Sequence, residues 1–349
     1  MCRKITRRRF CADIAATVSI ASLSDSALAS TAELKPIIKY RGGKSRELAN
    51  YLHYIPKDYD TYYEPFVGGA ATFFAIAPQK GVIGDINEPL INFYRDVRNR
   101  FPDLSRELAA IQEIYEKNQR DYRERKKNAP DERVPNANEE LYYSLRDQFN
   151  GLKPAQYSRA ALYFFINKTS YSGMIRYNAH GHFNVPFGRY EHFNTSLVTR
   201  AHSELLQRAE VLCADYEESF RRTGQNDFMY LDPPYDCIFN DYGNLEAENG
   251  FDEAAHRRLA RLFRKLKCRA LMVIGHTPLT EELYGDLVKA EYAKNYAVNI
   301  RNRFQSKATH YVVTNYPIQN GDNQHSVSLL RHLSTDAVQD ASGDRSSDS

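Results

Sequence analysis

The sequence has no tryptophan, no long apolar run and only five cysteines. The cysteines form no C-x-x-C pair and no spacing typical of zinc, so we expect reduced thiols and no metal centre. No stretch is apolar over the length that a membrane span requires. The net charge of +3 is too small to indicate a polyanionic partner. Any surface for nucleic acid must therefore come from local clustering of charge.

The chain does have length, apolar residues and aromatic side chains. Its 349 residues are 42% hydrophobic, which is enough for one large α/β domain or for a core domain with an inserted smaller one. The 25 tyrosines and 18 phenylalanines suit stacking on nucleic-acid bases, although they are equally ordinary core residues.

Two glycine-rich turns are similar to nucleotide-binding motifs without completing them. The segment Lys39–Ser45 ends like a P-loop, but a Walker sequence needs glycine at the position of Ile38. The segment Glu64–Ala70 follows a short strand pattern and precedes a helix of small residues, but it contains no G-x-G-x-x-G. Its glycines let the backbone pass under a nucleoside while the helix N-terminus faces the ligand.

A second strand, Val82–Gly84, is followed directly by Asp85. An acid about twenty residues after a glycine turn is placed to bind ribose hydroxyls in nucleoside-binding α/β folds. The alternative is that Asp85 caps the following helix.

The most informative stretch is Asp232–Tyr235, which ends the apolar run Phe228–Leu231. Neither Pro233 nor Pro234 can continue a β-ladder, so the backbone leaves the sheet there with its carbonyls free of strand partners. Ligands of open α/β sheets bind beyond the carboxyl ends of the strands. The stretch therefore presents a carboxylate, carbonyl groups and an aromatic ring where a site is expected.

Methylation of a flat exocyclic amine needs that set of groups. The amino lone pair of adenine is delocalised into its ring. A carboxylate and a carbonyl that each accept one amino hydrogen pull the nitrogen toward tetrahedral geometry, so that its lone pair points at an electrophilic methyl group. The ring of Tyr235 would stack on the base. The alternative is an ordinary turn after a strand, with a solvated Asp232.

The middle of the chain carries helices and then an irregular segment. Residues 101–149 and 157–168 have helical patterns, whereas residues 170–190 show neither a helical nor a strand period. An irregular segment of that length inside a domain is usually functional. Arg176 and Arg189 lie among its aromatic residues, a composition typical of nucleic-acid surfaces.

The rest of the chain alternates helix and strand. Residues 196–208 are predicted to be helical, and residues 211–216, 270–275 and 309–315 are predicted to be strands. Asp252 is placed to cap a further amphipathic helix.

The motifs described above occur in one order along the chain: Tyr40-Arg41-Gly42-Gly43-Lys44, Glu64-Pro65-Phe66-Val67-Gly68-Gly69, Gly84-Asp85-Ile86-Asn87 and Asp232-Pro233-Pro234-Tyr235. With them, the chain resembles the Dam-type DNA adenine methyltransferases from about residue 34 to residue 317. The segments Arg176–Asn178 and Phe183–Tyr190 are the most specific of the matches.

The resemblance implies an α/β fold, a Rossmann-like methyltransferase sheet that uses S-adenosyl-L-methionine. It implies an enzyme that flips adenine out of duplex DNA and methylates its exocyclic amine. The cofactor-binding part is expected at residues 34–100, a mostly helical target-recognition region at 101–210 and the catalytic part at 211–317. Residues 1–33 and 318–349 are expected to lie outside the fold.

The predicted functional residues form three sets. The catalytic set is Asp232, Pro233, Pro234 and Tyr235. The cofactor-binding set is Tyr40, Lys44, Phe66, Gly68, Asp85 and Asp232. The DNA-binding set is Lys39, Tyr171, Ser172, Met174, Arg176, Pro186, Arg189 and Tyr190.

Three of these positions imply GATC as the preferred site. Arg176 matches the reader of the guanine paired with the last cytosine, Lys39 matches a reader of the first guanine, and Pro186 lies where the thymine methyl is contacted. The chain departs from the family pattern at two places. Its turn reads Gly68-Gly69-Ala70 where many relatives have Gly-Ala-Gly, and Ser172 replaces an asparagine found in some members.

Two other functions remain open from the sequence. One is methylation of another exocyclic amine, in RNA or on cytosine, and the other is an inactive DNA-binding relative with an atypical glycine turn. The expected partner is double-stranded DNA, with no membrane and no metal. A cognate restriction endonuclease acting on the same site is a further partner that the sequence neither requires nor excludes.

The two ends of the chain are interpreted separately. The N-terminal segment is similar to a twin-arginine export signal, with a basic stretch at Thr6–Phe10 and a modest apolar segment at Ile14–Leu28. The acidic residues Asp13 and Asp25 weaken this similarity. An enzyme of chromosomal DNA has no substrate outside the cytoplasm. We therefore interpret residues 1–33 as a basic leader or an upstream extension, and expect a cytoplasmic, nucleoid-associated protein. The Ser-, Asp- and Gln-rich tail is expected to be disordered.

Overall fold

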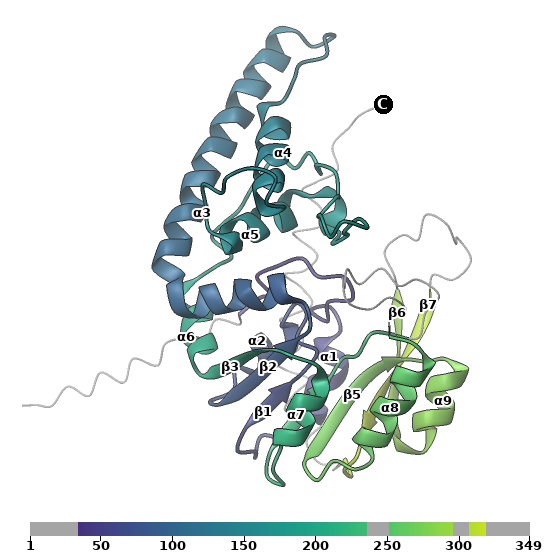
Figure 1. Cartoon of the computed structure of the whole chain (residues 1–349). Coiled ribbons are helices and arrows are strands. Elements are labelled where there is room, and N and C mark those ends of the chain that lie inside the picture. Colours follow the sequence, from purple (N-terminus) through teal and green to yellow (C-terminus); the bar gives the residue numbers. More distant parts are fainter. Residues whose placement is uncertain (1–33, 236–250, 296–306, 319–349) are drawn as a thin grey trace, which may run out of the picture. The chain divides into compact units, whose positions relative to one another are not determined.

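A seven-stranded sheet in the order β3-β2-β1-β4-β5-β7-β6 lies at the centre of the fold (Figure 1). The structure is a computed structural model, which describes residues 34–235, 251–295 and 307–318. The interpretations of the leader and of the tail beyond residue 318 lie outside the described residues. The strands are β1 (Tyr62–Glu64), β2 (Gly81–Asp85), β3 (Ala209–Cys213), β4 (Phe228–Leu231), β5 (Arg269–Gly275), β6 (Val288–Asn295) and β7 (Lys307–Thr314).

The connections of β1 decide where a ligand can bind. Tyr62 of β1 lies in parallel register with Gly81 of β2 on one side and with Phe228 of β4 on the other. From β1 the chain first builds β2 and β3, and later returns to build β4 and β5 on the opposite side. The carboxyl ends of β1 and β4 therefore flank the topological switch point, where open α/β sheets bind ligands. Beyond β5 the sheet continues with β7, which is antiparallel to β5, and ends with β6, which is antiparallel to β7.

Both faces of the central strands β1, β4 and β5 are buried, and the strand side chains alternate between them with period two. Tyr62 and Tyr230 belong to one apolar cluster, whereas Tyr63 and Leu231 belong to the other. Helices α1 to α6 contribute to the first cluster, and α7, α8 and α9 to the second. Their bounds are α1 (Leu48–Tyr51), α2 (Ala71–Ile76), α3 (Glu88–Asn128), α4 (Ala137–Phe149), α5 (Arg159–Thr169), α6 (Arg200–Gln207), α7 (Tyr216–Arg222), α8 (Glu253–Phe263) and α9 (Pro278–Tyr284).

Helix α3 runs from the sheet into the region of α4 and α5, with which it packs (Figure 1). Its 41 residues include one non-helical position, Arg100, two residues before Pro102. Proline cannot donate the helical hydrogen bond and crowds the preceding turn, which accounts for the kink. The boundary predicted between residues 100 and 101 falls at this kink.

The α/β fold predicted from the sequence is confirmed, and most predicted elements are present. Strand β4 has the predicted bounds, and Asp252 caps α8 by accepting a hydrogen bond from Ala255 at 2.8 Å. The strand predicted for residues 211–216 is wrong at its end, because β3 stops at Cys213 and Tyr216 begins α7. Among the α-helices and strands of the described residues, α7, α9 and the edge strand β6 were not predicted.

Candidate functional site

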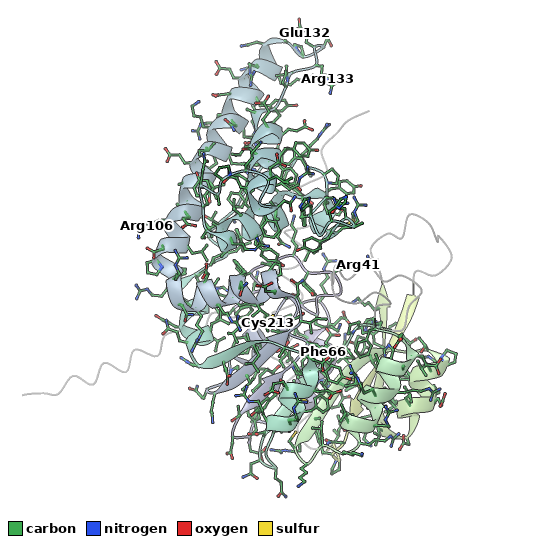
Figure 2. The ribbon with its side chains drawn as sticks, viewed as in Figure 1. Arg41, Phe66, Arg106, Glu132, Arg133 and Cys213 are labelled. Carbon is green, nitrogen blue, oxygen red and sulfur yellow. The ribbon has the colours of Figure 1, made fainter. Side chains whose placement is uncertain are left out.

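A cavity of about 270 Å³ lies at the carboxyl ends of β1 and β4. It is lined by residues 40–44 before α1, by the turn after β1, by Asp85 at the end of β2 and by residues 232–235 after β4. Arg41 and Phe66, which are labelled in Figure 2, both line it. All four motifs singled out in the sequence therefore meet at one place.

The carboxylate of Asp232 is held at one end of this cavity. The Lys44 ammonium, whose side chain is 3% exposed, lies 2.7 Å from Oδ1 of Asp232. The Tyr235 hydroxyl donates a longer hydrogen bond of 3.4 Å to the same oxygen. Burial raises the pKa of Asp232, and the positive charge of Lys44 opposes that rise. Both contacts fall on Oδ1, which leaves Oδ2 to accept a hydrogen from a ligand.

A second carboxyl group lines the cavity, on Glu64 at the end of β1. Its side chain is buried, and the Tyr62 hydroxyl donates to its Oε2 at 2.7 Å. Burial is the main cause that raises the pKa of Glu64 to about 8, so the group is mostly neutral at pH 7. Sequence reasoning assigned Glu64 no role. An acid followed by proline at a strand end, the pattern that identified Asp232, could have found it.

Asp85 is fixed by two backbone amides rather than by a helix. Gly68 N–H donates to Oδ2 of Asp85 at 3.1 Å, and Asn87 N–H donates to Oδ1 at 3.0 Å. The cap of α3 is Asn87, whose side chain accepts from Leu90 N–H at 3.2 Å. The alternative that Asp85 caps the helix is therefore wrong. Burial raises the pKa of Asp85, and the amide bonds oppose that rise.

The glycine turn after β1 brings the backbone against Tyr40. Gly68 has φ +43°, and a Cβ added there would lie 2.9 Å from the Tyr40 ring. Two positions further on, Ala70 has φ +57°, a left-handed conformation that costs a non-glycine residue about 1–2 kcal/mol. The departure at Gly68-Gly69-Ala70 thus places alanine in a left-handed conformation that glycine adopts without this cost.

Aromatic side chains form the other end of the cavity. The ring of Phe66 stacks on Tyr216 with centroids 5.1 Å apart, and Phe251 meets Phe66 edge-on at 6.1 Å. Arg258 lies 5.2 Å over the Tyr216 ring and donates to its hydroxyl at 2.9 Å. Sequence reasoning assigned no site role to Tyr216 or Phe251, because residues far apart in the chain give no signal that they share a pocket.

The irregular segment 170–190 folds back on itself as an antiparallel hairpin without regular strands. Tyr171 N–H donates to Pro186 O at 2.9 Å, and Asn184 N–H donates to Arg176 O at 3.1 Å. The hairpin is anchored in the core by three buried apolar residues. They are Phe183, Val185 and Phe187.

The predicted DNA-binding residues lie on or beside this hairpin. Six of them are exposed: Tyr171, Ser172, Met174, Arg176, Pro186 and Arg189. The other two, Lys39 and Tyr190, contact each other, with the Lys39 ammonium 3.8 Å from the centre of the ring. Because Lys39 precedes Tyr40, which lines the cavity, one short segment joins the hairpin to the cavity.

A second lysine lies beside Lys39 and was missed by sequence reasoning. Lys39 Nζ donates to the backbone oxygen of Lys168 at 3.1 Å. The Lys168 ammonium lies 5.4 Å from the centre of the Phe164 ring. Burial, and then the charge of Lys39, lower the pKa of Lys168 to about 8. A lysine ending a buried helix was the only available signal.

Two further findings concern the described parts of the chain. No group of three or more His, Cys, Asp or Glu side chains there could hold a metal ion. No helix among these residues has both the length and the apolar character needed to cross a membrane.

Comparison with known proteins identifies similar sequences. Residues 40–300 match the family model of the D12 class N6 adenine-specific DNA methyltransferases. The chain is 35% identical over 291 residues to the type II methyltransferase M.CviBI of Paramecium bursaria Chlorella virus NC1A, covering 81% of this chain and 100% of the relative. It is 30% identical over 279 residues to the DNA adenine methylase of Escherichia coli (strain K12), covering 78% and 90%.

Proposed function

Because the chain belongs to the D12 class of N6 adenine-specific DNA methyltransferases, we propose that it transfers the methyl group of S-adenosyl-L-methionine to adenine within GATC, after flipping the base out of the duplex. The observation that carries the proposal is the position of Asp232 beside Lys44, in the same cavity as Asp85 and the glycine turn. The substrate is chromosomal DNA, so we propose that the enzyme acts in the cytoplasm.

The lining of the cavity offers groups that suit this methyl donor. S-adenosyl-L-methionine supplies an electrophilic methyl group on a sulfonium, linked to an adenosine and an amino acid. Phe66 and Tyr216 offer aromatic surface for the adenine ring, and Asp85 offers carboxylate oxygens for the ribose hydroxyls. Lys44, Tyr40 and Gly68 line the remaining wall.

Asp232 holds the amine of the target base. Its Oδ2 accepts one amino hydrogen and a backbone carbonyl of the Asp232–Pro234 segment accepts the other, which directs the nitrogen lone pair at the methyl group. Tyr235 stacks on the base. Flipping costs a few kcal/mol of unstacking, and stacking on an aromatic ring returns about 1–3 kcal/mol per base.

The replacement Asp85→Ala tests the cofactor assignment. We expect the dissociation constant of S-adenosyl-L-methionine, measured by calorimetry, to rise by at least about tenfold, because ribose hydroxyls lose their acceptor. DNA affinity should stay unchanged. The matched control is Asn136→Ala, which removes the side-chain cap of α4 and should lower stability by about 1 kcal/mol without weakening cofactor binding. An unchanged cofactor affinity in Asp85→Ala would reject the assignment.

The low pKa of Lys168 predicts a pH dependence of DNA binding. We propose that Lys168 contacts the DNA backbone beside Lys39. Phosphate favours the charged ammonium, so binding raises the pKa of Lys168 from about 8. The affinity for DNA should therefore be highest below about pH 8 and should fall as the pH rises above that value.

The measurement is fluorescence anisotropy of a labelled duplex at several pH values and constant salt. Arginine stays charged throughout, so Lys168→Arg should lose this part of the pH dependence. Lys168→Met should bind more weakly at pH 7 and also lose it. A pH dependence that is the same in Lys168→Arg as in the parent would show that Lys168 does not contact DNA.

A further inference from the structure

A buried polar cluster lies behind the Lys44–Asp232 pair, and the proposed mechanism does not use it. The carboxylate of Glu47, which is 4% exposed, accepts hydrogen bonds from three side chains of the edge strands. Tyr292 of β6 and His310 of β7 each donate to Oε2 at 2.8 Å, and Lys294 of β6 bonds Oε1. The cluster therefore ties the turn that carries Lys44 to the antiparallel edge of the sheet.

The stability of the fold does not require such a cluster. Burial raises the pKa of Glu47, but the hydrogen bond from His310 and the charges of Lys44 and Lys294 outweigh it and bring the pKa down to about 2. The carboxylate is thus ionised at neutral pH. Apolar side chains of similar volume usually stabilise a core as well as a buried ion pair does. A role in positioning neighbouring side chains explains these residues better.

His310 also contacts the catalytic segment. Its ring meets the ring of Tyr235 nearly edge-on, with centroids 4.9 Å apart and an angle of 72°. The Tyr235 ring lies against the backbone of Gly275, where an added Cβ would be 3.6 Å away, and the Lys44 ammonium lies 4.8 Å from its centre. His310 is fully buried and is bonded to Glu47, so it cannot turn away from Tyr235 easily.

We propose that His310 is a positioning residue for methyl transfer: its ring, fixed by Glu47, holds Tyr235 in the orientation in which the flipped adenine stacks on it. The inference rests on the proposed role of Tyr235. A small displacement of a positioning group lowers the rate of the chemical step by a large factor, because the reacting atoms must already be aligned. No proton is moved by His310 in this role.

The test is a double-mutant cycle on the single-turnover rate of duplex methylation. Asparagine keeps an N–H near the position of Nδ1 but removes most of the ring, so His310→Asn should lower the rate about tenfold. Affinity for S-adenosyl-L-methionine should stay within about twofold, because His310 does not line the cavity. In a Tyr235→Ala background the same replacement should have no further effect. His310→Gln replaces His310→Asn if the latter does not fold.

Two variants separate positioning from stability. His310→Phe keeps an aromatic edge against Tyr235 and should restore the rate to within about threefold of the parent, even though the protein melts at a lower temperature. His202→Asn is the matched control, because His202 is also buried and meets the Phe74 ring edge-on at 4.9 Å, away from the cavity. It should lower the melting temperature without changing the rate.

The outcomes distinguish this inference from the proposed function. If Tyr235→Ala itself leaves the rate unchanged, the role of Tyr235 fails and the inference fails with it. If Tyr235→Ala is slow, the inference alone is overturned by any of three results. These are an unchanged rate in His310→Asn, an equal loss in both backgrounds, and a loss in His310→Phe as large as in His310→Asn.

Discussion

Replacement of Asp232 by alanine or asparagine is expected to lower the single-turnover methylation rate by at least about a hundredfold. Alanine removes both carboxylate oxygens, and asparagine keeps the shape while losing the charge that Lys44 pairs with at 2.7 Å. In the alanine variant the amine of the base loses its acceptor. In the asparagine variant Lys44 favours the amide oxygen on the Oδ1 side, so that the amide NH2, which cannot accept a hydrogen, faces the amine. The rate is measured as transfer of labelled methyl groups to a duplex that contains GATC.

Asp227, next to the opposite end of β4, provides a matched control. It precedes β4, whereas Asp232 follows it, and its Oδ2 accepts a hydrogen bond from Gly224 N–H at 2.7 Å. Asp227→Asn should therefore lower stability slightly and leave the rate unchanged. A rate for Asp232→Ala within about tenfold of the parent corresponds to only about 1.4 kcal/mol of barrier. That result would reject Asp232 as the group that holds the amine.

The end of β4 at residues 232–235 could be predicted because its cause is local. Two prolines end a strand, so the end of β4 at Leu231 follows from residues 228–235 alone. That Asp232 lines a cavity depends also on the segments that meet it from β1 and β2. The edge strand β6 was missed because its sequence, residues 288–295, mixes charged and apolar residues. Its place in the sheet depends on pairing with β7, which is a long-range contact.

The same distinction separates the predicted from the unpredicted parts of the site. Asp85 was found by its distance from the glycine turn, but its two amide partners became visible only in the structure. Glu47 and His310 are 263 residues apart in the sequence. Neither belongs to a motif with a known chemistry, so nothing in the sequence pairs them. Such tertiary contacts decide which buried polar residues support a site.

Replacement of Arg176 by alanine is expected to relax the choice of the fourth base pair rather than to weaken binding to all DNA. A bidentate contact from arginine to guanine is worth about 1–3 kcal/mol, or about 5- to 150-fold in discrimination. Arg176 is exposed, and Asn184 orients its guanidinium by accepting from Nε at 2.8 Å. Asn184→Ala should therefore give a smaller loss of the same kind.

The readout is the methylation rate on GATC compared with duplexes changed only at the fourth base. Two other arginines serve as comparisons. The side chain of Arg189 is 73% exposed and lies 3.9 Å from Glu139. We expect it to contact a phosphate. Arg189→Ala should therefore weaken binding to all duplexes equally and flatten its salt dependence. Arg106, labelled in Figure 2 on α3, should have no effect on discrimination. If Arg176→Ala also slows every duplex by one common factor, Arg176 contacts the backbone, and the proposed contact with the guanine is rejected.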